Sequence, residues 1–382
     1  MLLVIVFRPR RCVIGLVERF RTRLPVSQGL EQINALACDA VSPLDRDIEV
    51  LRRDYEVPPP WHSNEDFPIP AHLNDQLTRR PQQCATWLLR SRPWRLRCQH
   101  GQILRLSGQV LHDPSTDWSG LYGRSWPLWP GRRQPGMVLS LTNHGTANLY
   151  HWLFNPTLQL LRQMESLQID PSEAVALYLG PAWSNPLPTY VLQTLDALGL
   201  GTKPRLRRAV YPESLLMSMY ASTDSCPSQA QYQWLRQRLA PARTGRGLRL
   251  YLGRANAARR RLLNESALMA ELESMGFICI PDPAVLDFKQ QSHLLAHADV
   301  VLAPHGAALS LLFCCSPGTK VLEIHSPSYL SPLYAWMSLY GGLRYSALVA
   351  QPRPTPATAT MDDLWIDPQI VLDRLSEWGI AS

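Results

Sequence analysis

Lysine is scarce in this chain of 382 residues, which has only three lysines, Lys203, Lys289 and Lys320. Arginine therefore carries nearly all of the positive charge, and the formal net charge is +7. Arginine favours planar, bidentate contacts with phosphates and carboxylates. The charge balance suits an anionic ligand, a nucleic acid or an anionic membrane surface, although a biased base composition would produce the same excess of arginine.

Cysteine pairs of the CxxC type are absent, because the eight cysteines are scattered along the chain. Several of them lie in apolar stretches, as buried free thiols do. This pattern argues against a cysteine-based zinc site and indicates a reducing compartment. His293 and His297 are four residues apart, but no Glu follows the first and no third ligand is evident. We therefore expect neither a metal nor a bound cofactor.

Long hydrophobic runs are missing as well. The apolar residues 1–7 are too few for a membrane span or the core of a signal peptide, and we interpret them as a first strand or as the remnant of a misassigned start site. We expect a soluble, cytoplasmic protein, in contact at most with the inner face of a membrane. There is no P-loop, no GxGxxG motif after a strand and no GxSxG motif, which removes several common enzyme classes.

The length and the apolar fraction of 46% predict two folded cores. Residues 1 to about 130 are rich in Pro and Trp; we expect a helix in 28–41 and short strands in 87–106 and 108–111, and interpret Trp118, Trp126 and Trp129 as packing anchors. The predicted domains are 1–240, 241–350, and a linker with a closing helix at 351–382, and 241–247 is the expected hinge.

From residue 137 onward, apolar strands alternate with helical periodicity, which predicts α/β domains with parallel sheets. In the first domain we expect strands at 137–141, 174–179 and 205–211 and helices at 149–164, 189–198 and 229–239. In the second we expect strands at 248–252, 277–280, 299–303, 320–324 and 345–349, with helices at 260–275, 288–296, 331–340 and 367–378.

His305 and Gly306 follow the apolar strand 299–303 and open a short apolar helix. In parallel α/β sheets, ligands bind beyond the C-terminal ends of the strands, against helix N-termini. Gly306 allows backbone N–H groups to approach a ligand closely, and His305 can donate to an anionic oxygen. A tight turn with a surface histidine is equally compatible with these residues.

We expect a cluster of arginines at the same edge of the second sheet, where the C-terminal ends of its strands lie. Arg254 follows strand 248–252, and Arg260 and Arg261 come shortly before Asn264, near the next helix start. Guanidinium groups beside a helix N-terminus form a strong site for a diphosphate. The alternative for the last three residues is a solvated basic turn leading into an ordinary helix.

The first domain has its own strand-to-helix junction, which carries Asn148, His151 and Trp152. Asn148 and His151 are three residues apart and therefore share a helix face. His151 has the chemistry of a general base or of a ligand for a substrate hydroxyl. A histidine satisfied by a neighbouring backbone group is the competing interpretation.

Together these stretches resemble the family 61 glycosyltransferases over about residues 137–349. The motifs that carry the resemblance are NLYHW (148–152), YLGR (251–254), RRLLNE (260–265), DFKQQ (287–291), APHGAAL (303–309), SPGTKVLEI (316–324) and GLRY (342–345). The resemblance implies a GT-B architecture, in which two Rossmann-like domains face each other across a cleft. It also implies metal-independent, inverting transfer from a nucleotide sugar, usually a UDP-sugar, to an oligosaccharide or polysaccharide acceptor.

The same resemblance implies roles for individual residues. Residues 1–240 become the acceptor side and 241–350 the nucleotide-sugar side. His151 is then the candidate base, with Asn148 and Trp152 on the acceptor side of the cleft. Glu323 is expected to hold the ribose or simply to begin the next turn. The full set implied for the donor is Arg254, Arg260, Arg261, Asn264, His305, Gly306, Ala307 and Glu323.

The chain departs from the family pattern at Ala308, Leu311 and Asn155, and Gly253 stands where Ser is usual. We expect a cytoplasmic bacterial enzyme that builds a surface or capsular polysaccharide. The departures leave open a non-catalytic protein that binds nucleotides or carbohydrates on the same fold. A nucleic-acid binder is not expected, because no recognisable module accompanies the positive charge.

Overall fold

The computed structural model describes residues 47–56, 59–62, 64–79, 84–99, 102–107, 130–142, 148–154, 156–180, 186–220, 227–245, 247–353 and 362–380. The strand expected at 1–7, the helix expected at 28–41, the strand expected at 108–111, the three tryptophans at 118, 126 and 129, and Asn155 lie outside these residues. In the described part of the chain, none of the helices is both long enough and apolar enough to cross a membrane.

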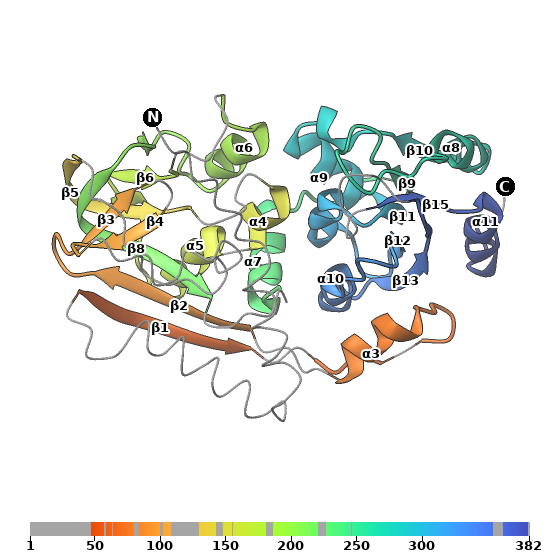
Figure 1. Cartoon of the computed structure of the whole chain (residues 1–382), viewed down its shortest axis with the longest axis horizontal. Helices are drawn as coiled ribbons and strands as arrows, with labels where there is room; N and C mark the ends of the chain where they lie inside the picture. Colours follow the sequence, from red (N-terminus) through yellow and green to blue (C-terminus); the bar gives the residue numbers. More distant parts are fainter. Residues whose placement is uncertain are drawn as a thin grey trace, which may run out of the picture.

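The chain forms two large sheets that lie side by side (Figure 1). The first has eight strands, in the order β1-β2-β8-β5-β6-β7, and β3 pairs with both β8 and β4. Its strands are β1 (Ile48–Glu56), β2 (Cys84–Ser91), β3 (Leu96–Gln99), β4 (Gln102–Arg105), β5 (Arg132–Ser140), β6 (Ala176–Tyr178), β7 (Arg205–Leu206) and β8 (Val210–Tyr220).

This first sheet is mixed, so the expectation of a parallel sheet is only partly right. β8, β5, β6 and β7 are parallel neighbours, whereas β1 and β2 add antiparallel strands. The edge strand β1 carries charged residues such as Arg52, Arg53 and Asp54, which suits an edge and hides the strand from an apolar pattern. The strand predicted at 205–211 is two strands, β7 and the start of β8.

Helices cover one face of this sheet. The helix expected at 149–164 is interrupted, because Pro156 lacks a backbone N–H and begins a new helix. These helices are α4 (Leu149–Phe154), α5 (Pro156–Ser166), α6 (Thr189–Ala197) and α7 (Gln229–Leu239), with a short 3₁₀ turn η2 (Pro171–Glu173). α3 (Ala71–Arg79) is drawn apart from this sheet, below β13, in Figure 1.

The second sheet is entirely parallel and has the order β10-β9-β11-β12-β13. Counted within the sheet this is 2-1-3-4-5, a doubly wound order whose direction reverses between β9 and β11. All five strands were predicted from the sequence. They are β9 (Leu248–Leu252), β10 (Phe277–Ile280), β11 (Ala298–Pro304), β12 (Lys320–His325) and β13 (Arg344–Val349).

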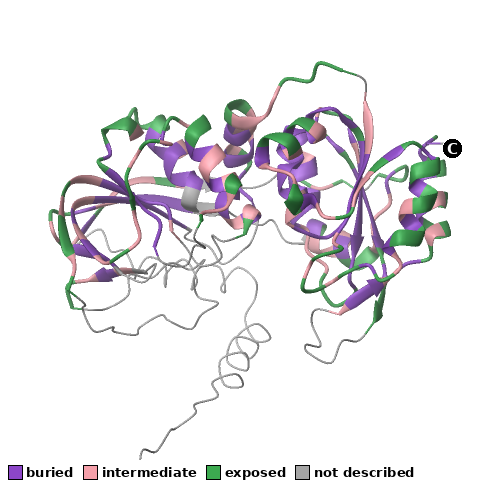
Figure 2. Ribbon diagram, turned by 90° about the horizontal axis from the view of Figure 1, so that it is seen from above, coloured by how far each residue is buried: buried purple, intermediate pink, exposed green. Residues whose placement is uncertain are grey.

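Both faces of the second sheet are covered, as Figure 2 shows by its buried strands. On β11, Val301 packs into the cluster beneath α9, η4 and α10, and Leu302 into the cluster beneath α8 and α11. The remaining elements are α8 (Glu265–Ser274), η3 (Pro283–Val285), α9 (Phe288–Ala296), η4 (Ala307–Cys314), α10 (Leu333–Gly341), β14 (Gln351–Arg353), β15 (Asp363–Trp365) and α11 (Pro368–Glu377).

The helix predicted at 260–275 starts only at Glu265. Arg260 has a φ of 55°, in the left-handed region, which is incompatible with a right-handed helix. Residues 254–264 therefore form a turn between β9 and α8, held in place by contacts with distant parts of the chain.

A continuous apolar cluster joins the two halves of the molecule, from Leu139 and Trp152 to Phe313 and Trp336. Polar bonds reinforce it, since the Tyr232 hydroxyl donates to the carbonyl of Leu312 at 3.3 Å. Where α7 meets η4 the halves are packed against each other. The arrangement of two Rossmann-like domains facing across a cleft stays a prediction.

The segment 64–68, which follows β1 in the sequence, packs on the second sheet. The carbonyl of Pro68 accepts bonds from Ala347 N at 3.4 Å, from Arg374 Nη1 at 3.2 Å and from the Ser346 hydroxyl. Trp378 Nε1 donates to the carbonyl of Asp66 at 3.1 Å. A domain boundary at residue 240 remains a prediction. These bonds join residues before that boundary to residues after it.

Asp54 is expected to contribute to stability in a pH-dependent way. Its carboxylate accepts bonds from Arg52 at 2.6 Å, Arg162 at 2.6 Å and Gln163 at 3.1 Å. Burial alone would raise its pKa, but these partners together lower it. Replacing Asp54 by Asn should cost about 2 kcal/mol at neutral pH, because it weakens a mostly buried ionic network.

The direction of the pH dependence follows from the lowered pKa of Asp54 in the folded state. The stabilisation is present above the ordinary aspartate pKa of about 3.9 and is lost as pH falls through the folded-state value. Urea denaturation at neutral and acidic pH measures this. Asp373→Asn, at an exposed site on α11, is the control. An equal difference between wild type and Asp54→Asn at both pH values would contradict the prediction.

Candidate functional site

The C-terminal ends of β9 and β11 meet at the point where the strand order of the second sheet reverses. In sheets of this order the ligand site lies at that reversal, beyond the strand ends. Arg254 follows β9, and His305 and Gly306 follow β11. The structure brings Arg254 against Gly306, since a Cβ built on Gly306 would lie 2.1 Å from Arg254 Nη1. The juxtaposition expected from the sequence is therefore present.

Glu265 fixes the backbone at Arg254. Its buried carboxylate accepts bonds from Arg254 N and from the Tyr251 hydroxyl, each at 2.8 Å. A Cβ on Gly253 would come within 2.6 Å of this carboxylate and of the carbonyl of Pro281, which explains why glycine stands there. The sequence placed Glu265 only at a helix start, and its anchoring role was missed.

Arg260 joins Arg254 at the site. Its guanidinium lies over the ring of Tyr329, 4.8 Å from the centroid. Within the described residues, Arg254 Nε, Arg260 Nε and Arg260 Nη1 are buried and have no hydrogen-bond partner. Buried donors of this kind call for an acceptor. Burial, and then the charge of Arg260, lowers the pKa of Arg254 to about 10, so that it stays charged at neutral pH.

Arg261 and Asn264 do not join this cluster. Arg261 forms an ion pair with Asp363 at 2.6 Å, and its backbone N donates to the same carboxylate at 2.9 Å. Asn264 Nδ2 donates to the carbonyl of Ile366 at 2.7 Å. Both side chains tie the turn to the chain around β15. Their expected role in donor binding is corrected to a structural one.

His305 is held by a chain of buried groups. Its Nδ1 hydrogen-bonds to Glu323 Oε1, while the Tyr345 hydroxyl donates to Glu323 Oε2 at 2.6 Å. His325 Nε2 lies 3.3 Å from the same Oε2. Glu323 is fully buried and its oxygens are occupied, so the expected ribose contact is corrected: Glu323 contacts His305.

Burial and mutual contacts shift the pKa values of His305 and Glu323. Burial lowers the pKa of His305, although Glu323 opposes the shift. Burial would raise the pKa of Glu323, but His325 and His305 hold it well below its usual range. At neutral pH the site therefore combines an ionised carboxylate with a neutral His305.

His305, Glu323 and His325 are residue types that bind metals, and one ligand atom from each lies within 4.8 Å of the others. Their contacts instead are those of a hydrogen-bonded carboxylate. Both oxygens of Glu323 accept bonds, and an ion would have to displace His305 and Tyr345 from them. The expected absence of a metal stays a prediction.

On the first half, α4 carries the other predicted residues. Asn148 is exposed, and its Oδ1 accepts a bond from Tyr150 N at 2.9 Å, so it caps α4. Trp152 is fully buried and its Nε1 donates to Thr194 at 2.8 Å. Trp152 is thus a core residue, and its expected place on the acceptor side is wrong.

His151 is half-buried on α4 and approaches the second half through tyrosines. Its ring centroid is 5.4 Å from that of Tyr150, which is 6.4 Å from that of Tyr334. The Tyr334 ring in turn lies 5.1 Å from His305. Two tyrosine rings therefore separate the candidate base from the candidate anion site.

The departures in η4 have a packing explanation. Leu311 is fully buried in the apolar cluster that joins the two halves, and Ala308 packs against it. Ala307, which was expected to help cradle the ligand, begins η4 directly after Gly306 and is half-buried. The changed residues therefore do not remove a charged group from the site.

Replacing Gly306 by alanine is expected to weaken UDP binding about tenfold, because the new methyl group displaces the Arg254 guanidinium from its position. The fold should persist, since the atom displaced is the end of a flexible side chain. Calorimetric titration with UDP measures the effect. Gly245→Ala, whose Cβ would meet His297 at an ordinary 3.4 Å, is the control. Equal affinities of the two variants would contradict the prediction.

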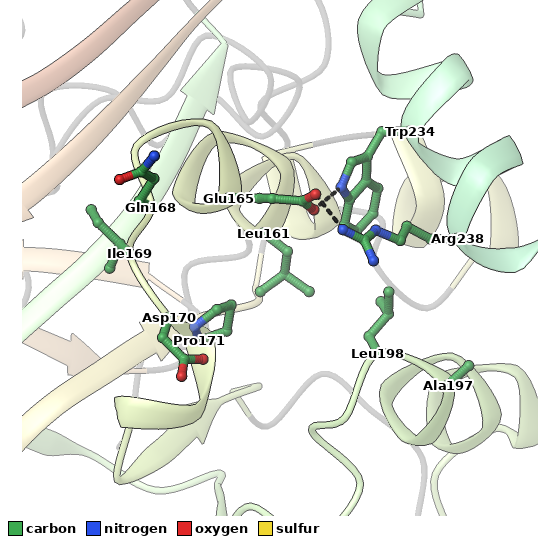
Figure 3. Close-up of a pocket in the computed structure, with 10 residues that line it drawn as sticks. All are labelled: Leu161, Glu165, Gln168, Ile169, Asp170, Pro171, Ala197, Leu198, Trp234 and Arg238. Carbon is green, nitrogen blue, oxygen red and sulfur yellow. Dashed lines mark hydrogen bonds and ion pairs between the residues drawn. The ribbon is translucent and has the colours of Figure 1, made fainter.

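A separate pocket of about 460 Å³ lies in the first half, between α5, α6 and α7 (Figure 3). Glu165 accepts a bond from Trp234 Nε1 at 2.7 Å and pairs with Arg238. None of the predicted site residues lines this pocket. Glu165, Trp234 and Arg238 bind one another, so we assign the pocket no role in the chemistry.

Comparison with known proteins gives three findings. Residues 149–322 match the family model described as Glycosyltransferase 61. A stretch of 65 residues is 40% identical to the rice (Oryza sativa subsp. japonica) protein Beta-1,2-xylosyltransferase RCN11, covering 17% of this chain and only 12% of that protein. The solved structure of the dodecameric iron-containing heptosyltransferase TibC, with ADP-D-beta-D-heptose, matches over 68% of each chain at 11% identity, with a TM-score of 0.29.

Proposed function

Because residues 149–322 belong to the glycosyltransferase 61 family, we propose that this protein transfers a sugar from a nucleotide sugar to a glycan acceptor, with inversion at the sugar carbon. The resemblance predicted from the sequence motifs is confirmed by this match. The observation that carries the proposal is the set of buried guanidinium donors on Arg254 and Arg260, which have no partner among the described residues.

In the proposed reaction the departing nucleoside diphosphate gains negative charge as the glycosidic bond to it breaks. Arg254 and Arg260 offset that charge at the strand ends, where preorganised cations stabilise a leaving group most effectively. Gly306, which directly precedes η4, lies against the Arg254 guanidinium. Two fixed positive charges take the part that a divalent ion plays elsewhere, so the proposal needs no metal.

Inversion requires a base that accepts the proton of the acceptor hydroxyl on the face opposite the leaving group. His151 on α4 is our candidate, because it belongs to the other half of the molecule and lies beyond Tyr150 and Tyr334 from His305. A base on one half and a diphosphate site on the other would suit an in-line displacement.

UDP is the proposed nucleotide, and UDP-xylose is the first donor to test, because the rice relative is a xylosyltransferase by name. The proposed acceptor is an oligosaccharide or polysaccharide of a bacterial surface or capsule. The proposed location is the cytoplasm, with peripheral contact at the inner face of the membrane.

Calorimetric titration with UDP, with and without EDTA, tests the proposal. We expect saturable binding with one site per chain, and the same affinity after chelation. UDP release from UDP-xylose then tests turnover. Absence of binding by UDP and by other nucleoside diphosphates would contradict the proposal, and loss of binding in EDTA would contradict its metal independence.

Binding of UDP without turnover of any donor would favour the alternative, a nucleotide-binding protein on the same fold. That alternative was motivated by the departures at Leu311 and Asn155. The buried packing of Leu311 weakens its case, because this change fills the core and leaves the charged groups of the site in place.

A further inference from the structure

We propose that Glu323 is a positioning residue which makes His305 a proton-accepting partner of the diphosphate, so that nucleotide binding is coupled to uptake of one proton. This inference rests on the proposed function, since it concerns the same site. Glu323 would act through His305, without touching the nucleotide.

The geometry fixes which nitrogen of His305 can meet a ligand. Glu323 is an ionised carboxylate with no proton to donate, so the Nδ1 that it contacts carries the hydrogen. In neutral His305, Nε2 is then an acceptor. Across the described residues no hydrogen bond engages this Nε2. A neutral His305 therefore presents a lone pair, which repels phosphate oxygens instead of binding them.

A proton on Nε2 changes that interaction. The imidazolium donates to a phosphate oxygen, and its charge is balanced by Glu323 on the other side of the ring. The proton comes from the solvent and forms one N–H bond, so neutral imidazole becomes imidazolium. The arriving diphosphate supplies the negative charge that favours this step.

The surroundings of His305 keep it neutral until the diphosphate arrives. Burial and the neighbouring cations disfavour its charge, and Glu323 alone does not outweigh them. The titratable and charged groups that face His305 are Arg254 after β9, Arg260 in the β9–α8 turn, Glu323 and His325 on β12, Tyr345 on β13, Tyr329 before α10, and Tyr334 on α10.

Tyr345 and Trp61 restrict the position of the Glu323 carboxylate. Tyr345 donates to it from β13, and the Tyr345 ring packs edge-on against Trp61 at 6.3 Å between centroids. β11, β12 and β13 are neighbouring parallel strands (Figure 1), and His305 follows β11, Glu323 lies on β12 and Tyr345 lies on β13.

Calorimetric titration with UDP in two buffers of different ionisation enthalpy, at about pH 7.5, counts the protons taken up. We expect wild type to take up close to one more proton per UDP than His305→Gln, whose amide donates without titrating. Subtracting the variant removes protons that belong to UDP itself. Wild-type affinity should fall as pH rises, and the affinity of His305→Gln should change less.

Glu323→Gln removes the charge but keeps an acceptor for Nδ1, and we expect it to lose most of the proton uptake and to bind UDP about tenfold more weakly. Tyr345→Phe retains the Glu323 carboxylate and should keep the proton uptake. A merely structural role of Glu323 would leave proton uptake intact in all folded variants.

UDP binding with equal proton uptake in wild type and His305→Gln would overturn this inference alone. Absence of UDP binding would overturn the proposed function as well.

Discussion

Replacing Arg254 by alanine is expected to weaken UDP binding by about 100-fold, which corresponds to about 2.7 kcal/mol. Arg254 lies against Gly306, is anchored through its backbone by Glu265, and has a buried Nε without a partner in the described structure. A charged donor in such a place contributes more than an exposed one, because water competes less for the diphosphate. Calorimetric titration with UDP measures the loss.

Arg261→Ala is the matched control, seven positions further along the same turn. Arg261 pairs with Asp363 away from the site, so we expect its removal to change UDP affinity less than twofold. Arg254→Lys should recover part of the affinity, since lysine restores the charge but not the planar fork. A larger loss in Arg261→Ala than in Arg254→Ala would place the diphosphate elsewhere.

Replacing His151 by alanine is expected to lower kcat by a factor of about 10² to 10⁴, the usual contribution of a general base. UDP affinity should stay within about twofold of wild type, because His151 lies on α4, in the half opposite the arginines. Initial rates with the donor that supports UDP release measure kcat, and calorimetry measures binding.

His72→Gln, on the exposed side of α3, is the control for loss of a histidine. Loss of UDP affinity in His151→Ala, with kcat unchanged, would assign His151 to the donor site. An unchanged kcat and affinity would remove it from the reaction and reopen the search for the base.

The second sheet could be predicted because its strands are buried on both faces. Such strands read as continuous apolar runs, as in β11, and their order follows from short crossovers. The first sheet was harder, because its edge strand β1 is charged and pairs with β2 through contacts that no local pattern encodes. Pro156 divides the helix predicted at 149–164, because it lacks a backbone N–H and begins a new helix.

The candidate site, too, could be predicted only in part. Arg254, Arg260 and His305 were predicted to meet because strand ends on one edge of a parallel sheet converge. Arg261 and Asn264 were misassigned, since their partners Asp363 and Ile366 lie 102 residues away in the chain. For Glu323 a signal existed: a carboxylate inside an apolar central strand must be buried and must have partners.

The segment 64–68 limits where the chain can be divided. The second sheet and α11 are completed by carbonyls of Asp66 and Pro68, which belong to the chain before the first sheet is finished. A fragment starting at residue 241 would leave Trp378 Nε1 and Arg374 Nη1 without these acceptors. Such a fragment would therefore need residues 64–68, supplied as a peptide or joined to it, to restore these two bonds.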